Sequence, residues 1–192
     1  RGVASRRGDT CTFIANIQRQ VIQILAAEQD STKLVDLLPE VLTFVQDQLT
    51  SLKNGTASLD ELIVTQTLSR ELDHYSVLSP LAAAAHQLRI QGKNVRMGMQ
   101  IRYIYVARAP GVHAWDLPNP PDGKAVDGIK YRVLIMRAVQ EVLQPLGVTD
   151  AILKNWLIGQ VGYLAPPGFL KTSNPTRLAL PLLADLKYLR VD

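Results

Sequence analysis

The chain has 192 residues, 47% of them hydrophobic, and carries a formal net charge of +4. That length and apolar content fit one large domain with a packed core, or one domain with a small appendage. No apolar run approaches the ~20 residues that span a bilayer, and no secretion signal is recognisable, so we expect an intracellular protein with no membrane partner.

Two helical regions are predicted in the first third of the chain. Apolar residues recur at helical spacing over residues 12–28, with Asp9 or Thr10 as the expected N-cap. A second helical region covers residues 31–53, where Pro39 cannot donate a helical hydrogen bond and therefore predicts a break just before it.

The middle of the chain mixes strand and helix signals. Ser58-Leu59-Asp60-Glu61 has the spacing of a capping box and precedes a β-branched strand over residues 62–68. Ser79-Pro80 is typical of a helix start, and Gly92 is expected to end this helix before a strand at residues 101–104.

The remaining third begins with a stretch rich in Pro and Gly at residues 109–124, which predicts a surface loop. A helix is expected over residues 127–146, stopped by Gly147. Beyond it we expect, in order, a short helix at residues 150–158, a Gly/Pro loop at 159–168 and an amphipathic stretch from Pro175 that breaks at Pro181.

Charge is distributed unevenly along the chain. Residues 1–27 are net positive and residues 28–73 strongly net negative. Residues 74–115 contain no acid, and their basic side chains are Arg89, Lys93, Arg96, Arg102 and Arg108. A one-sign stretch of that length is typical of phosphate contact, although a solvated face is the simpler alternative. The acidic middle indicates that only one side of the domain would meet a nucleic acid.

The order of signals between Ser58 and Val106 resembles the thumb subdomain of family B DNA polymerases. It comprises a strand ending in Leu68-Ser69-Arg70, a Tyr at position 75, a Pro-led helix, the basic turn Gly92–Gly98 and the strand Ile101–Ile104. Two flanking segments are also similar to that family, namely Arg1–Cys11, where palm passes into thumb, and Ile129–Gly147, a helix that returns to the thumb core.

The sequence departs from the family pattern at several positions. Ala4 stands where the family has Glu, and Gly8 stands where it has a second Arg. Ser76, Leu81 and Met97 replace the common Lys, His and Pro, so the resemblance implies a weaker grip than in typical members.

The resemblance implies a mostly α, α+β fold: a helical thumb subdomain with a small antiparallel β element. We expect residues 1–11 to be the palm-to-thumb connection, 12–147 the thumb and 148–192 a C-terminal extension. The implied function is to grip primer-template duplex DNA through phosphates, without reading sequence, during replication or repair. The implied partners are that duplex and the palm, fingers and exonuclease parts of the polymerase.

Catalysis is not expected from this chain alone. It has no paired-Asp motif, and phosphoryl transfer depends on divalent ions held by such carboxylates. We therefore expect no cofactor here and Mg²⁺ in the parent palm, with the chain as the C-terminal piece of that enzyme. The lone Cys11 and the three His have no partners at metal-ligand spacing; Cys11 is expected to be a small buried side chain.

The candidate DNA contacts come from turns and strand ends, where a side chain reaches outward from a rigid support. Arg70 follows a strand, and Arg96 lies in a turn framed by two glycines whose backbone can approach a phosphate closely. The full set of predicted DNA-binding residues is Arg7, Ser69, Arg70, Tyr75, Ser76, Lys93, Asn94 and Arg96.

Two other interpretations stay open at this point. The chain could be a helical protein-interaction domain whose acidic face binds a partner, or the separate small subunit of a split polymerase. Tyr75 and Tyr103 are equally compatible with core packing, and Arg102 with a solvent-facing charge.

Overall fold

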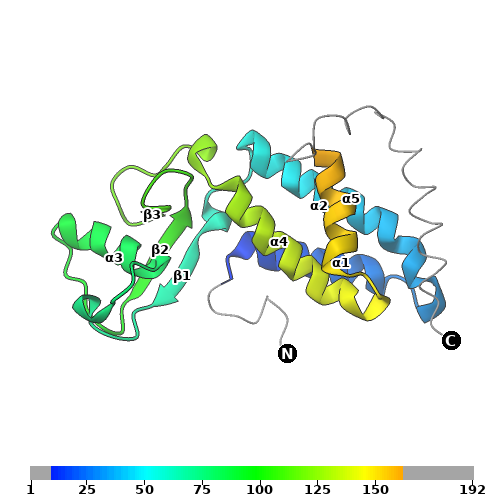
Figure 1. Cartoon of the computed structure of the whole chain (residues 1–192), viewed down its shortest axis with the longest axis horizontal. Helices are drawn as coiled ribbons and strands as arrows, with labels where there is room; N and C mark the ends of the chain where they lie inside the picture. The colour runs from blue at the N-terminus through cyan, green and yellow to red at the C-terminus, as the bar shows by residue number, and fades with distance from the viewer. Residues whose placement is uncertain (1–9, 162–192) are drawn as a thin grey trace.

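The computed structural model describes residues 10–161. Four α-helices form a bundle: α1 (Thr12–Ala26), α2 (Leu38–Asn54), α4 (Gly128–Leu143) and α5 (Asp150–Val161). A smaller lobe, the sheet lobe, holds α3 (Pro80–Ile90) and the strands β1 (Val64–Thr67), β2 (Gln100–Tyr105) and β3 (Val112–Ala114). The sheet lobe lies at one end of the molecule and the bundle at the other (Figure 1). The architecture is α+β and mostly helical with a small antiparallel sheet, as predicted.

Apolar stripes hold the bundle together. On α1 the buried side chains include Phe13, Ile17 and Val21, which recur at helical spacing. The buried Gln18 donates from Nε2 to the carbonyl of Ala138 on α4 at 2.9 Å, so α1 and α4 are joined by a polar contact as well. The expected cap was wrong, because Cys11 is the N-cap residue of α1 and no side chain caps this helix.

The break before α2 is confirmed. Residues Ser31–Leu37 form the 3-10 helix η2, and Pro39 occupies the first turn of α2, where its missing N–H costs nothing. Gly55 ends α2 in the left-handed region at φ 69°.

The strands form one antiparallel sheet in the order β1-β2-β3. Val64 pairs with Tyr103, and Tyr105 pairs with Val112. Strand β3 was missed from the sequence, which predicted a loop over residues 109–124. The reason is physical: three residues bounded by Pro and Gly carry no periodic signal, and β3 is held instead by its neighbours.

One of these neighbours is Gln87 on α3, which pairs with the outer edge of β3. Its Nε2 donates to the Val112 carbonyl at 2.8 Å, and its Oε1 accepts from the Ala114 N–H at 2.8 Å. The side chain satisfies backbone groups that an edge strand leaves open. Ser79 caps α3, as predicted, and the buried alanine run of residues 82–85 lets the helix lie close to the sheet.

The capping box predicted at Ser58–Glu61 does not form. The 3-10 helix η3 (Asp60–Leu62) starts after Leu59 without a side-chain cap, and the Glu61 carboxylate instead accepts from Asn16 Nδ2 at 3.2 Å. The strand therefore begins at Val64, two residues later than predicted.

Tyr131 of α4 joins the bundle to the sheet lobe. Its hydroxyl donates to the Leu62 carbonyl at 2.6 Å and accepts from the Tyr105 N–H at 3.2 Å. If the register of β1 and β2 continued two residues beyond Val64 and Tyr103, it would pair residues 62 and 105, so the hydroxyl bridges the two strands where they separate. Tyr105 also packs edge-on against the rings of Tyr103 and Tyr131.

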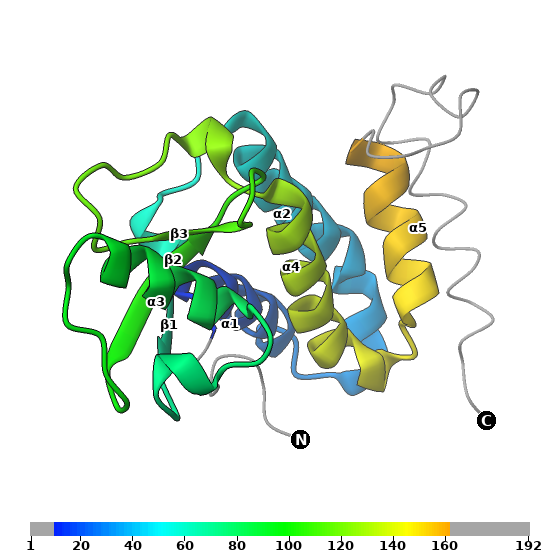
Figure 2. The same ribbon diagram turned by 60° about the vertical axis from the view of Figure 1, so that its left-hand side comes forward.

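Helix α5 packs on α2 and α4 (Figure 2) and contributes Leu153, Trp156 and Leu157 to the same core. It runs past Gly159, so the loop expected at 159–168 cannot begin there. The amphipathic stretch from Pro175 lies outside the described residues, and the division of the chain at residue 147 stays a prediction. Within residues 10–161, no helix combines the length and apolarity needed to cross a membrane.

Candidate nucleic-acid interface

Two loops meet at one end of the sheet, where β1 ends and β2 begins. Beyond the last paired residues the backbone ladder continues, with the Leu68 N–H donating to Met99 at 2.9 Å and the Gly98 N–H donating to Leu68 at 2.8 Å. The segment after β1 and the turn before β2 are therefore neighbours. We call this surface, formed by residues 69–71, Tyr75 and the turn 92–98, the loop face.

Ser69, Arg70 and Tyr75 form a contact cluster on the loop face. The Tyr75 hydroxyl accepts from the Ser69 N–H at 3.3 Å and lies 3.4 Å from the Ser69 hydroxyl. The Arg70 guanidinium lies 4.9 Å from the centre of the Tyr75 ring, and its Nη1 donates to the His74 carbonyl at 3.4 Å. The hydrogen bond from Ser69, helped by the nearby Arg70 charge, lowers the pKa of Tyr75.

Arg96 lies in the adjacent turn. The Arg96 carbonyl accepts from the Met99 N–H at 3.2 Å, and Gly98 adopts φ 86°, which closes the turn tightly. The Arg96 side chain is exposed and forms no ion pair or hydrogen bond with the part of the chain described here. Its charge is thus available to an anion in solution.

Of the remaining predicted residues, Lys93 and Asn94 also lie in the turn 92–98. The Lys93 ammonium donates to the carbonyl of Asp116, so this side chain is directed to the segment after β3 rather than to Arg96. Ser76 and Asn94 are exposed. Arg7 lies outside the described residues. The structure therefore brings together Ser69, Arg70, Tyr75 and Arg96, while the assignment of all eight to DNA binding stays a prediction.

Charge separates along the long axis of the molecule. Most acids of residues 28–61 lie on η2, α2 and η3, on the bundle side, whereas the stretch 74–115 builds α3, β2 and β3. Two ion pairs of the sheet lobe were not anticipated. Arg89 binds Asp73 at 2.7 Å and lowers the pKa of that carboxyl, and Arg102 pairs with Asp116.

The contact made by Glu71 was also not anticipated from the sequence. Glu71 directly follows Arg70, and its Oε1 accepts from the N–H of Met97, 26 residues later, at 3.2 Å. Adjacency to Arg70 was visible in the sequence, but the contact with the turn before β2 was not.

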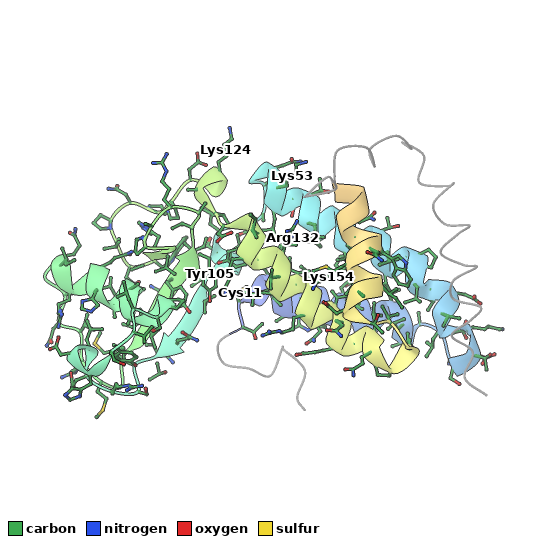
Figure 3. The ribbon with its side chains drawn as sticks, in the orientation of Figure 1. Cys11, Lys53, Tyr105, Lys124, Arg132 and Lys154 are labelled. Atoms are coloured by element: carbon green, nitrogen blue, oxygen red, sulfur yellow. The ribbon has the colours of Figure 1, made fainter. Side chains whose placement is uncertain are left out.

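The described residues hold no group of three His, Cys, Asp or Glu that is arranged to bind a metal ion. A cavity of about 120 Å³ lies away from the loop face, at the joint between the lobes, where Cys11 and Tyr105 lie close together (Figure 3). Burial raises the pKa of Cys11 to about 11, which makes the thiol a poor nucleophile.

The fold has a solved counterpart. A family B DNA polymerase from Pyrobaculum calidifontis superposes with a TM-score of 0.61 at 24% sequence identity, over 73% of this chain and 18% of that chain.

Curated relatives agree. The chain is 26% identical over 172 residues to the DNA polymerase of Archaeoglobus fulgidus, covering 80% of this chain and 21% of that protein. It is 29% identical over 171 residues to the DNA polymerase alpha catalytic subunit of Dictyostelium discoideum, covering 82% of this chain and 11% of that protein. The chain thus spans about a fifth or less of these two relatives. The family model "DNA polymerase family B" matches residues 1–141. The chain belongs to DNA polymerase family B.

Proposed function

We propose that this chain is the thumb portion of a family B DNA polymerase and that its loop face grips primer-template duplex DNA without reading sequence. The observation that carries this proposal is the pair of cations on the loop face. Arg70 and Arg96 are exposed, neither is neutralised by an acid within the described residues, and both extend from turns fastened to the sheet. Such side chains suit phosphates, because a thumb must follow the duplex whatever its sequence.

Tyr75 supports this arrangement. The Arg70 guanidinium lies over its ring, and its hydroxyl accepts from the N–H of Ser69, the second residue after β1. A cation held over a ring loses less freedom when it meets a phosphate than a free side chain would.

The chemistry would come from elsewhere in the polymerase. We propose that the palm, with Mg²⁺ held by its carboxylates, extends the primer, while this chain holds the product duplex and raises processivity inside the cell. The chain alone, incubated with primer-template, dNTPs and Mg²⁺, is then expected to add no nucleotide.

The test is a titration of labelled duplex by fluorescence anisotropy at several salt concentrations. With about three to five phosphates neutralised, log K should fall against log[salt] with a slope of roughly −3 to −5, equally for unrelated sequences. Arg70→Ala and Arg96→Ala should each weaken binding by about 1 kcal/mol and flatten the slope by about one unit. Arg108→Ala is the matched control, because Arg108 is exposed just past the opposite end of β2.

Each other outcome favours a different interpretation. A flat salt response, or a preference for one sequence, would support a protein-interaction domain instead. Equal losses of affinity in Arg70→Ala, Arg96→Ala and Arg108→Ala would indicate diffuse electrostatic attraction. The loop face would then not be the DNA-binding surface.

A further inference from the structure

Glu71 is a carboxylate in an unexpected place. It lies on the loop face between two cations proposed to bind phosphates, and it is exposed. A negative charge there opposes the approach of DNA. Glu71 does not compensate by neutralising a neighbour, because it forms no ion pair with Arg70 or Arg96 in the part of the chain described.

What Glu71 does contact is the backbone of the turn. Its Oε1 accepts from the Met97 N–H at 3.2 Å, next to the residue whose side chain is to meet phosphate. Its own main chain is fixed on the other side, since the Glu71 carbonyl accepts from the His74 N–H at 3.0 Å. The side chain thus spans from the segment that carries Arg70 to the turn that carries Arg96.

The turn has few other anchors at that point. Two backbone hydrogen bonds attach its end to Leu68: the Gly98 N–H donates to the Leu68 carbonyl at 2.8 Å, and the Leu68 N–H donates to the Met99 carbonyl at 2.9 Å. Apart from the bond to Glu71, the hydrogen bonds of Arg96 and Met97 with the described residues are within the turn itself. Gly92 and Gly98 flank the turn at φ 77° and 86°. Because glycine is conformationally permissive, the segment between them can adopt other backbone conformations unless a contact such as that of Glu71 holds it.

We propose that Glu71 is a positioning residue, which holds the turn 92–98 against the end of β1 so that Arg70 and Arg96 act as one pair on the duplex. This inference rests on the proposed function of the loop face. It predicts an effect opposite in sign to simple electrostatics: removing this negative charge weakens binding to a polyanion, because the hydrogen bond to Met97 matters more than the repulsion.

The experiment compares Glu71→Ala with Glu71→Gln in the same duplex titration. Glutamine keeps an oxygen that accepts from the Met97 N–H but loses the charge. Glu71→Ala should raise Kd by up to about fivefold, the loss expected for Arg96→Ala, and flatten the salt slope by up to ~0.9, because Arg96 no longer contacts the phosphate. Glu71→Gln should bind at least as tightly as the unmodified chain, with an unchanged slope.

Two controls complete the design. In an Arg96→Ala background, Glu71→Ala should cause no further weakening, because its effect passes through Arg96. Asp47→Ala and Asp47→Asn remove an exposed carboxylate from the middle of α2 and should leave affinity almost unchanged. A thermal melt of each variant verifies that affinities are compared between folded proteins.

The outcomes separate the two proposals. If the unmodified chain shows no salt-dependent duplex binding, the proposed function fails. If the chain binds and Arg96→Ala weakens it, yet Glu71→Ala binds equally or more tightly, only the positioning role is overturned. Equal weakening by Glu71→Ala and Glu71→Gln also overturns it, since the conservative variant should rescue binding.

Discussion

One buried hydroxyl, that of Tyr131, links the two lobes, and Tyr131→Phe tests its contribution directly. The Tyr131 side chain is fully buried, and its hydroxyl satisfies the carbonyl of Leu62 and the N–H of Tyr105. Phenylalanine keeps the ring but leaves the buried Leu62 carbonyl and the part-buried Tyr105 N–H without this partner. Each unsatisfied buried group costs roughly 1–3 kcal/mol, and the part-buried Tyr105 N–H can still reach water, so we expect a loss of about 2–4 kcal/mol in the free energy of unfolding.

Urea unfolding followed by circular dichroism measures this loss. With an m value of ~1–3 kcal/mol/M, the midpoint should fall by about 1–2 M while m stays constant. The matched control is Tyr75→Phe, which removes a hydroxyl from the loop face and should cost under about 1 kcal/mol. Faster amide exchange at Tyr105 in Tyr131→Phe would identify the broken contact. If Tyr131→Phe is no less stable than Tyr75→Phe, the joint is held by ring packing and our reasoning is wrong.

Two further predictions concern the bundle and its edge. The Cys11 thiol ionises near pH 9 in the unfolded chain, whereas in the folded protein it keeps its proton to about pH 11. Because the folded state binds more protons between these pH values, the free energy of unfolding should fall by up to ~3 kcal/mol as pH rises through them. Cys11→Ala should lack this component of the pH profile, and an undiminished component would contradict it. A Cβ on Gly123 would lie 2.5 Å from the Gly55 carbonyl oxygen, so Gly123→Ala should cost roughly 1–3 kcal/mol in thermal melts. Gly128→Ala has open space and should gain about 0.4–1 kcal/mol, and the reverse order would refute this account.

The helices could be predicted because their signals are local. Apolar spacing on α1 and α2, Pro39 after a break and Ser79 before Pro80 each depend on residues a turn or two apart. The fold class as a whole was predicted with the help of the resemblance to the family.

The sheet and the loop face depend on contacts between distant residues, which periodicity does not encode. Strand β3 pairs with β2 and is bound on its other edge by Gln87, and Glu61 contacts Asn16 rather than completing a cap with Ser58. The grouping of Ser69, Arg70 and Tyr75 could be expected from their closeness in the sequence. The link from Glu71 to Met97 could not, since only the pairing of β1 with β2 brings them together.

The most direct test of the central claim is to map duplex binding residue by residue. Backbone amide shifts of the isotope-labelled chain can be followed by NMR as an arbitrary-sequence duplex is added. Our account predicts that the largest changes occur at residues 69–76 and 94–98 and disappear at high salt, while α2 is unaffected. Changes concentrated on α1, α2 or α5, with the loop face unchanged, would contradict it.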